Sequence, residues 1–277
     1  MKIGIISSWN DTLSLFSVLT KFNHSYVIFR DQTLYPFGSK DFNFIIKNLQ
    51  KEIDFLRKKW AEKIILDPVY ELYFLQDNLY KNQIFPLFSC YLQEFVFPFS
   101  LVGKIGILTD FSSREISQNL IAQEENKFSL TDKQQATKKF HFPFAYRVKA
   151  AWSRMYNIQD LGVHNPFLIK TMKNDLRYFK DAGVDTIIPL HYRFFQMQRT
   201  FKSFFNFHKI RFHDFSFIER SFEKVYEKIA HQKTENTLEY SLDIYSNQSE
   251  AFFLQEKKLL RTVTRWLTIP YQFSLID

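Results

Sequence analysis

The stretch Lys2-Ile3-Gly4-Ile5-Ile6-Ser7-Ser8 opens the chain as a short apolar run that enters a polar turn. Its β-branched residues and its abrupt polar end predict a buried strand. Similar runs follow at Tyr26 to Phe29 and at Lys63 to Leu66, and between them apolar residues recur at steps of three and four from 41 to 60. That spacing predicts an amphipathic helix. Strands that alternate with helices indicate a parallel sheet covered by helices.

The same alternation extends along most of the chain. Further strands are expected at 84–88, 104–108, 184–188, 210–213 and 238–245, and further helices at 13–20, 166–179, 216–229 and 248–260. Asn165 and Pro166 suit the start of the second of these helices, and Gly183 suits a left-handed terminator after it. The polar, Lys-rich region 123–149 lacks a clear period, so we expect an inserted loop that could contain a helix.

Composition limits the class of protein. The 277 residues are 45% hydrophobic, which is enough for a sizeable core and argues against disorder. The net charge of +8 comes from basic residues spread among carboxylates, so we expect no nucleic-acid partner. No window has about 18 uninterrupted apolar residues, and the N-terminus lacks the pattern of a signal peptide. We therefore expect a cytoplasmic protein without a membrane segment.

Cys90 is the single cysteine of the sequence. One thiol excludes an intramolecular disulfide, a four-thiolate zinc site and any reaction that needs two thiols in one chain. Its apolar surroundings favour a buried small residue over a nucleophile. The histidines lack metal-ligand spacing, since His208 and His213 are five apart on an expected strand and would face opposite sides. We expect neither a metal nor a cofactor.

Several motifs, in order, resemble the glutamate racemase (aspartate/glutamate racemase) family. The opening strand and turn resemble the start of such an enzyme, and Phe29-Arg30-Asp31 followed by Pro36-Phe37-Gly38-Ser39-Lys40 resembles its next motif. The stretches 104–109 and 183–188 resemble the strand that opens the second domain and the strand that leads to the second catalytic cysteine. Four of the six glycines fall at matched places, namely Gly4, Gly38, Gly106 and Gly183.

This resemblance implies two flavodoxin-like parallel-sheet lobes with a ligand cleft between them. The first lobe would comprise residues 1–97 and 209–277, and the second residues 98–208. It also implies a small metabolite in that cleft, a possible homodimer, and a role in amino-acid metabolism that supplies cell-wall peptidoglycan precursors. Family members invert the α-carbon of a free amino acid with one cysteine on each face.

Both cysteine positions carry other residues. Asp67-Pro68-Val69-Tyr70 stands where the first cysteine is expected, and Pro189-Leu190-His191-Tyr192 where the second is expected. Proline transfers no proton, so two-thiol racemisation within one chain is excluded. We therefore expect a racemase-like protein without that activity, which binds a metabolite or a protein partner. The alternative is an active isomerase or lyase on a small carboxylate or amino acid that uses Asp67 and His191 as its acid and base.

The expected cleft residues end strands or belong to the matched motifs: Ser7, Ser8, Phe37, Gly38, Asp67, Val69, Tyr70, Leu190 and His191. The simpler interpretation of the two titratable residues is that Asp67 caps the next helix and that His191 has no catalytic role. Because Val69, Tyr70, Pro189 and Leu190 are bulky or apolar, we expect a filled site that binds glutamate weakly or not at all.

Overall fold

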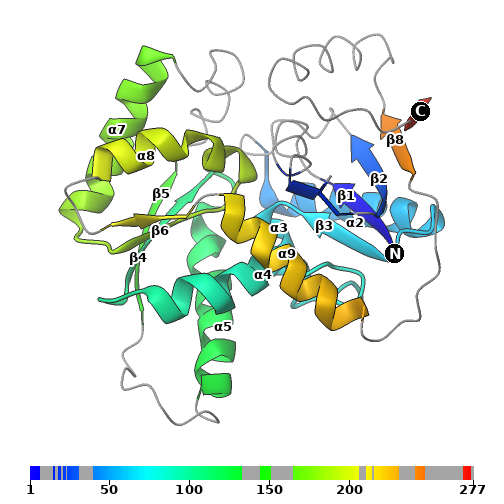
Figure 1. Ribbon diagram of the computed structural model, residues 1–277, viewed down its shortest axis with the longest axis horizontal. Coiled ribbons are helices and arrows are strands. Elements are labelled where there is room, and N and C mark those ends of the chain that lie inside the picture. Colours follow the sequence, from blue (N-terminus) through cyan, green and yellow to red (C-terminus); the bar gives the residue numbers. More distant parts are fainter. Residues whose placement is uncertain are drawn as a thin grey trace. The chain divides into compact units, whose positions relative to one another are not determined.

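The computed structural model describes residues 1–6, 15, 18–19, 21–22, 24–30, 40–132, 144–150, 165–205, 210–213, 215–230, 241–246 and 271–275 (Figure 1). The chain divides into two compact units, Met1–Pro86 with Tyr226–Asp277, and Leu87–Val225. The boundaries expected from sequence, at 97/98 and 208/209, both lie inside the second unit. Residues 87–99 belong to that unit because they bond to one of its helices, as the 2.6 Å hydrogen bond from Ser89 Oγ to Glu124 Oε2 shows.

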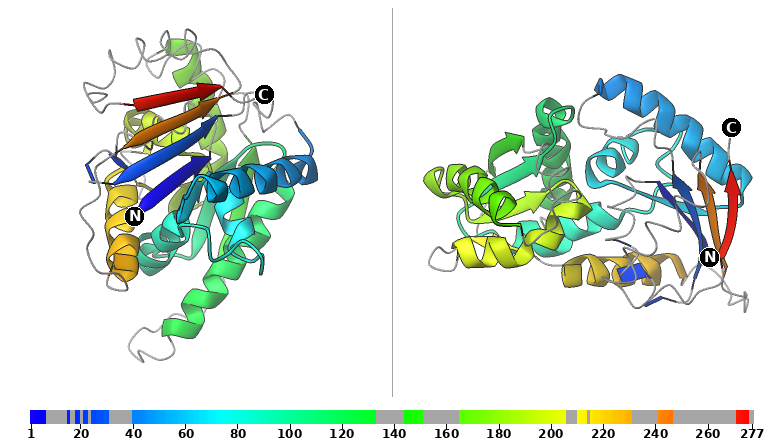
Figure 2. Two further views of the ribbon diagram at one scale, coloured as in Figure 1. Left: turned by 90° about the vertical axis from the view of Figure 1, so that its right-hand side faces the viewer. Right: turned by 90° about the horizontal axis from the view of Figure 1, so that it is seen from above.

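The first unit is built on a five-stranded parallel sheet. Its strands are β1 (Lys2–Ile6), β2 (Ser25–Arg30), β3 (Lys63–Leu66), β8 (Leu242–Ser246) and β9 (Tyr271–Leu275), in the order β3-β1-β2-β8-β9. Figure 2 (left) shows β1, β2, β8 and β9 pointing in one direction. The helices are α2 (Phe42–Lys58) and α3 (Pro68–Phe74). A single parallel bridge between Ile64 and Ile84 extends the sheet beyond β3.

The second unit is built on a four-stranded parallel sheet. Its strands are β4 (Lys104–Thr109), β5 (Ala145–Ala150), β6 (Thr186–Pro189) and β7 (Arg211–Phe212), in the order β5-β4-β6-β7. Its first helix is α4 (Leu87–Tyr91), which is followed by a π-helical turn over Leu92–Val96 and a 3-10 turn over Phe97–Phe99. The later helical elements are α5 (Arg114–Asp132), α7 (Pro166–Asp181), the 3-10 turn Tyr192–Met197 and α8 (Gln198–Phe205). Helix α9 (Phe215–Ala230) begins in this unit and ends in the first. Two parallel sheets confirm the predicted α/β fold class.

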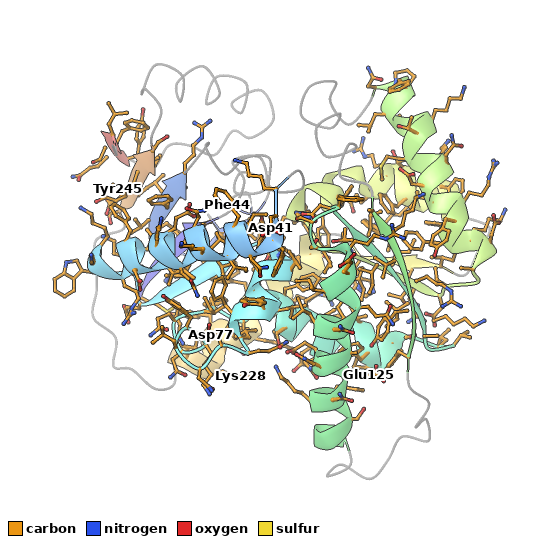
Figure 3. The ribbon with its side chains drawn as sticks, turned by 180° about the vertical axis from the view of Figure 1, so that it is seen from behind. Asp41, Phe44, Asp77, Glu125, Lys228 and Tyr245 are labelled. Carbon is orange, nitrogen blue, oxygen red and sulfur yellow. The ribbon has the colours of Figure 1, made fainter. Side chains whose placement is uncertain are left out.

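Local sequence explains where the main helices begin and end. The Asp41 side chain accepts a hydrogen bond from the backbone N–H of Phe44 and caps α2 (Figure 3). Asn165 caps α7 in the same way, with Pro166 in its first turn. Gly183 ends α7 with a φ of 65°, as expected from the sequence.

Two glycines, one on β1 and one on β4, allow a helix to pack closely against each of these strands. A Cβ on Gly106 of β4 would lie 2.7 Å from Cδ1 of Phe179 on α7, and one on Gly4 of β1 would lie 2.8 Å from Cδ1 of Leu56 on α2. Both distances are too short for real atoms. The ring of Phe179 therefore rests directly on the backbone of β4, within an apolar core that includes Leu108, Met172 and Phe201.

The structure differs from two expectations from sequence. In region 123–149, where we expected an inserted loop that could contain a helix, α5 runs to Asp132 and Ala145–Ala150 forms the strand β5, while 133–143 lie outside the described residues. The helix shows no clear apolar period in the sequence because its inner face buries polar side chains, among them Ser117 and Glu124. The strand expected at 84–88 is one bridge at Ile84, since α4 already begins at Leu87.

Other expectations lie partly or wholly outside the described residues. The helix expected at 248–260 does so entirely, and of the helix expected at 13–20 only Leu15, Val18 and Leu19 are described, all helical and buried. Strand β9 was not anticipated. None of the helices in the described part of the chain has the length and apolar character that crossing a membrane requires.

Candidate functional site

The predicted site residues are described only in part. Ser7, Ser8, Phe37 and Gly38 lie outside the described residues. The others follow two strands: Asp67, Val69 and Tyr70 come directly after β3 in the first unit, and Leu190 and His191 directly after β6 in the second. Each strand therefore delivers its residues to the carboxyl edge of its own sheet, where parallel sheets hold their ligands.

The end of β3 is filled by packed side chains. Asp67 occupies the N-cap position of α3, and its backbone oxygen accepts from the N–H groups of Tyr70 and Glu71 at 3.0 and 2.9 Å. Its carboxylate accepts no hydrogen bond from the first turn of that helix, so the expected side-chain cap is absent there. Asp67 and Tyr70 are each 1% exposed and Val69 is fully buried, while the Tyr70 ring stacks on Phe42.

The end of β6 is held to the neighbouring strand by its backbone. Pro189 is the last residue of β6 and stands opposite Leu108 of β4. The next residue, Leu190, donates its N–H to the Leu108 carbonyl at 2.9 Å and is fully buried. The position expected for the second thiol is therefore part of the sheet itself.

His191 forms an ion pair that the sequence did not reveal. Its Nε2 lies 3.1 Å from Oδ2 of Asp110, which follows β4, and the two side chains are 2% and 0% exposed. The other carboxylate oxygen, Oδ1, accepts from the Ser113 N–H at 2.7 Å and the Ser112 hydroxyl at 2.9 Å. Burial alone would raise the pKa of Asp110, but the hydrogen bond and positive charge of His191, together with Ser113, lower it to about 2. An ionised Asp110 stabilises a protonated imidazole beside it.

Asp110 is the main functional candidate that sequence reasoning missed. The available signal was the polar turn Thr109-Asp110-Phe111-Ser112-Ser113 directly after an apolar strand, since Asp and Ser there can hydrogen-bond the backbone of their own turn. The Thr109 and Ser113 hydroxyls also hydrogen-bond each other at 2.7 Å, which completes a closed network around the carboxylate.

Other chemistry-bearing residues lie apart from these strand ends. Cys90, which is 9% exposed, is on α4 and follows neither β3 nor β6. His213 is buried after β7, with its Nδ1 3.1 Å from the Tyr91 hydroxyl and its ring stacked on Phe217; His208 lies outside the described residues. Among the residues that the structure describes, no group of three His, Cys, Asp or Glu side chains could hold a metal ion.

Comparison of the amino-acid sequence with known proteins gives no family. No family model matches it, and no curated protein matches it.

Comparison of the structure finds glutamate racemases. Isoform RacE1 from Bacillus anthracis matches with a TM-score of 0.74 at 11% identity, over 99% of this chain and 97% of that one. The enzyme from Francisella tularensis, solved with D-glutamate, matches with a TM-score of 0.71 at 12% identity, over 100% and 97%. The Escherichia coli enzyme, solved with L-glutamate and the activator UDP-MurNAc-ala, matches with a TM-score of 0.64 at 13% identity, over 100% and 98%.

Identities this low show the fold alone. Along its whole length, the chain has the fold of the glutamate racemases.

Proposed function

We propose that this protein is a non-catalytic relative of the glutamate racemases, which has kept the fold and acts by binding a metabolite or a protein partner. The observation that carries the proposal is the cysteine inventory. Inverting an α-carbon with two thiols needs one cysteine on each face of the substrate, and the whole sequence contains only Cys90.

The surroundings of the two expected thiol positions also support this proposal. Pro68 begins α3 and Pro189 ends β6, and neither side chain has a group that can donate or accept a proton. The neighbouring Val69 and Leu190 are fully buried among other side chains. An amino-acid zwitterion would need several hydrogen-bonding partners to offset its loss of hydration, and these residues offer none from their side chains.

The alternative, an acid and base formed by Asp67 and His191, is less well supported. A group that removes an α-proton must reach the substrate within hydrogen-bond distance. Both side chains are almost fully buried, and His191 is already bound to the ionised Asp110. The pair joins the ends of β4 and β6, which explains the position of His191 without a catalytic role.

Exchange of the α-proton tests the proposal directly. Purified protein is incubated in D2O with L-glutamate, D-glutamate, L-aspartate or D-aspartate, and the α-proton signal is followed by NMR alongside an active glutamate racemase. We expect no loss of signal above the protein-free rate. Exchange at ordinary enzyme rates would overturn the proposal. The variants Asp67→Asn and His191→Gln, checked for folding by circular dichroism, would then show whether the alternative pair is responsible.

A further inference from the structure

We propose that the outer edge of β5 is a docking site for an extended, acidic peptide segment of another protein, which would add to the sheet of the second unit as a further strand. The proposal rests on the hydrogen bonding of β5, the groove beside it and the charge of that groove. It does not depend on the residues that follow β3 and β6, so it can fail or hold independently of the proposed function.

Within the described residues, strand β5 has one bonded edge and one open edge. It is the terminal strand of its sheet and pairs only with β4 in the described part of the chain. The Ala145 N–H donates to the Gly103 carbonyl at 2.7 Å, which fixes the direction of every peptide group in the strand. Because these groups alternate along a parallel strand, those of Tyr146, Val148 and Ala150 point away from β4. Outward groups of this kind are what an added strand pairs with.

A groove of about 690 Å³ runs beside this open edge. Tyr146, Val148 and Arg147 of β5 line it. Because successive side chains of a strand point to opposite faces, Tyr146 and Val148 lie on one face of the sheet and Arg147 on the other. The helices on the two faces also contribute, with Arg114 from α5 and Tyr178 from α7. A groove with this lining opens along the edge of the strand rather than on either face, which is where an added strand would lie.

Strand β5 also contacts the helices on both of its faces. Glu125 on α5, labelled in Figure 3, accepts from the Phe144 N–H at 3.1 Å and from the Tyr146 hydroxyl at 2.6 Å. On the other face, Lys149 lies 3.8 Å from Asp175 of α7 and over the ring of Tyr178. Both helices therefore fix β5 in place, which reduces the entropy lost when a partner strand pairs with it.

The charge of the groove indicates the kind of peptide. Arg114 and Arg147 line it with one carboxylate, Glu115. Within the described residues, neither guanidinium forms an ion pair with a carboxylate. Arg147 instead donates to the carbonyl of Tyr146 at 3.1 Å, one of the outward groups, and would have to release it to a partner. Acidic side chains at alternate positions of an added strand would pair with these cations.

Charged residues on an edge strand can also serve to prevent unwanted pairing. The aromatic side chains favour a binding site here. Phe111 and Tyr178 line the groove and are 65% and 41% exposed, so apolar surface faces solvent beside the open edge. An edge strand whose charges serve only to prevent pairing does not need an exposed apolar surface beside it, whereas a partner strand would cover that surface.

Titration with designed peptides tests the proposal. The probe is a fluorescein-labelled peptide of alternating valine and glutamate, eight residues long, and binding to the full-length protein is followed by fluorescence anisotropy. We expect saturable binding with Kd below about 1 mM. Two control peptides should bind at least about tenfold more weakly: one in which lysine replaces each glutamate, and a valine-glutamate peptide N-methylated at alternate residues. Absence of binding at 1 mM protein, or equal binding of all three peptides, would overturn the proposal.

Two variants and a control variant test whether the peptide binds to the outer edge of β5. Val148→Pro removes an outward N–H without removing a bond to β4, and Arg147→Glu reverses a charge on the groove. Each variant should raise the Kd of the valine-glutamate peptide by at least about tenfold. Arg147→Glu should also lower the Kd of the valine-lysine peptide. The control Arg199→Glu reverses an exposed charge on α8 and should leave the affinity unchanged. Equal effects of all three variants, or self-association of the protein that Val148→Pro abolishes, would show that a foreign acidic strand is not the occupant.

Discussion

Nε2 of His191 and Oδ2 of Asp110 lie 3.1 Å apart in the interior of the second unit and join the ends of β6 and β4. Removing one partner of a buried pair leaves an uncompensated charge. We expect Asp110→Asn and His191→Gln each to lower the free energy of unfolding at pH 7 by about 3 kcal/mol. The double variant should lose clearly less than the sum, because the two residues act as one pair. Additive losses in urea denaturation would show that the pair is not coupled.

The same pair predicts a pH dependence. The pKa of Asp110 falls from 3.8 in the unfolded chain to about 2 in the folded protein. A carboxyl group with a lowered pKa stabilises the folded state fully above the unfolded value and loses that contribution as the pH falls through the folded value. Stability should therefore decline between about pH 4 and pH 2. Asp110→Asn should show a shallower decline over this window when both proteins are unfolded by urea at each pH.

Calorimetric titration with glutamate tests whether the buried residues after β3 and β6 leave room for an amino acid. Since Val69 and Leu190, which follow β3 and β6, are fully buried and apolar, we expect either enantiomer to bind with a Kd poorer than roughly 1 mM, equivalent to only about 4 kcal/mol. An active glutamate racemase titrated in parallel shows that the measurement can detect binding. Micromolar affinity for D- or L-glutamate would mean that polar contacts come from other residues, and the protein would then be a candidate glutamate sensor.

Gly106→Ala tests the contact between β4 and α7. The new methyl group would lie 2.7 Å from Cδ1 of Phe179, so the ring and its helix must shift within a packed core. We expect a loss of about 1–3 kcal/mol in the free energy of unfolding. Combining it with Phe179→Leu should restore part of that loss, because the smaller side chain relieves the overlap. An unchanged stability of Gly106→Ala would show that the core adapts freely.

Trp60 offers a stabilising substitution at the end of α2. It has a φ of 66° and is 83% exposed, and its N–H donates to Arg57 O while that of Ala61 donates to Leu56 O. Glycine is the residue best suited to this position. We expect Trp60→Gly to raise the free energy of unfolding by about 1 kcal/mol. Trp60→Ala keeps a Cβ and with it the strain, so its stability should stay close to that of the original protein.

Local sequence predicts much of the fold. The strand Lys63–Leu66 was predicted with its observed bounds, and Asn165 and Gly183 fixed the ends of α7, because each depends on a few neighbouring residues. Strand β5 was missed because Ala145–Ala150 is a partly exposed edge strand that carries Arg147 and Lys149, so it lacks an apolar run. Apolar content marks buried strands and not edges.

The candidate site was predictable only in part, for a different reason. Leu190 and His191 were placed after a strand by local pattern, and the structure has them there. The partner of His191 comes from another strand, and pairing between distant stretches leaves no local pattern in one sequence. The register between β4 and β6 decides that Asp110 meets His191, and that register emerges only in the assembled sheet.

The residues at the ends of β3 and β6 limit how this chain could acquire two-thiol chemistry. Two-thiol chemistry would require a cysteine after β3 and another after β6 in the same molecule, and neither change alone would confer racemase activity. Each single change would alter a buried strand end that now packs without a thiol. Natural selection for racemase activity therefore has no advantageous first step to act on. Under the proposed binding role, substitutions at these two strand ends are expected to be limited by packing and not by the chemistry of racemisation.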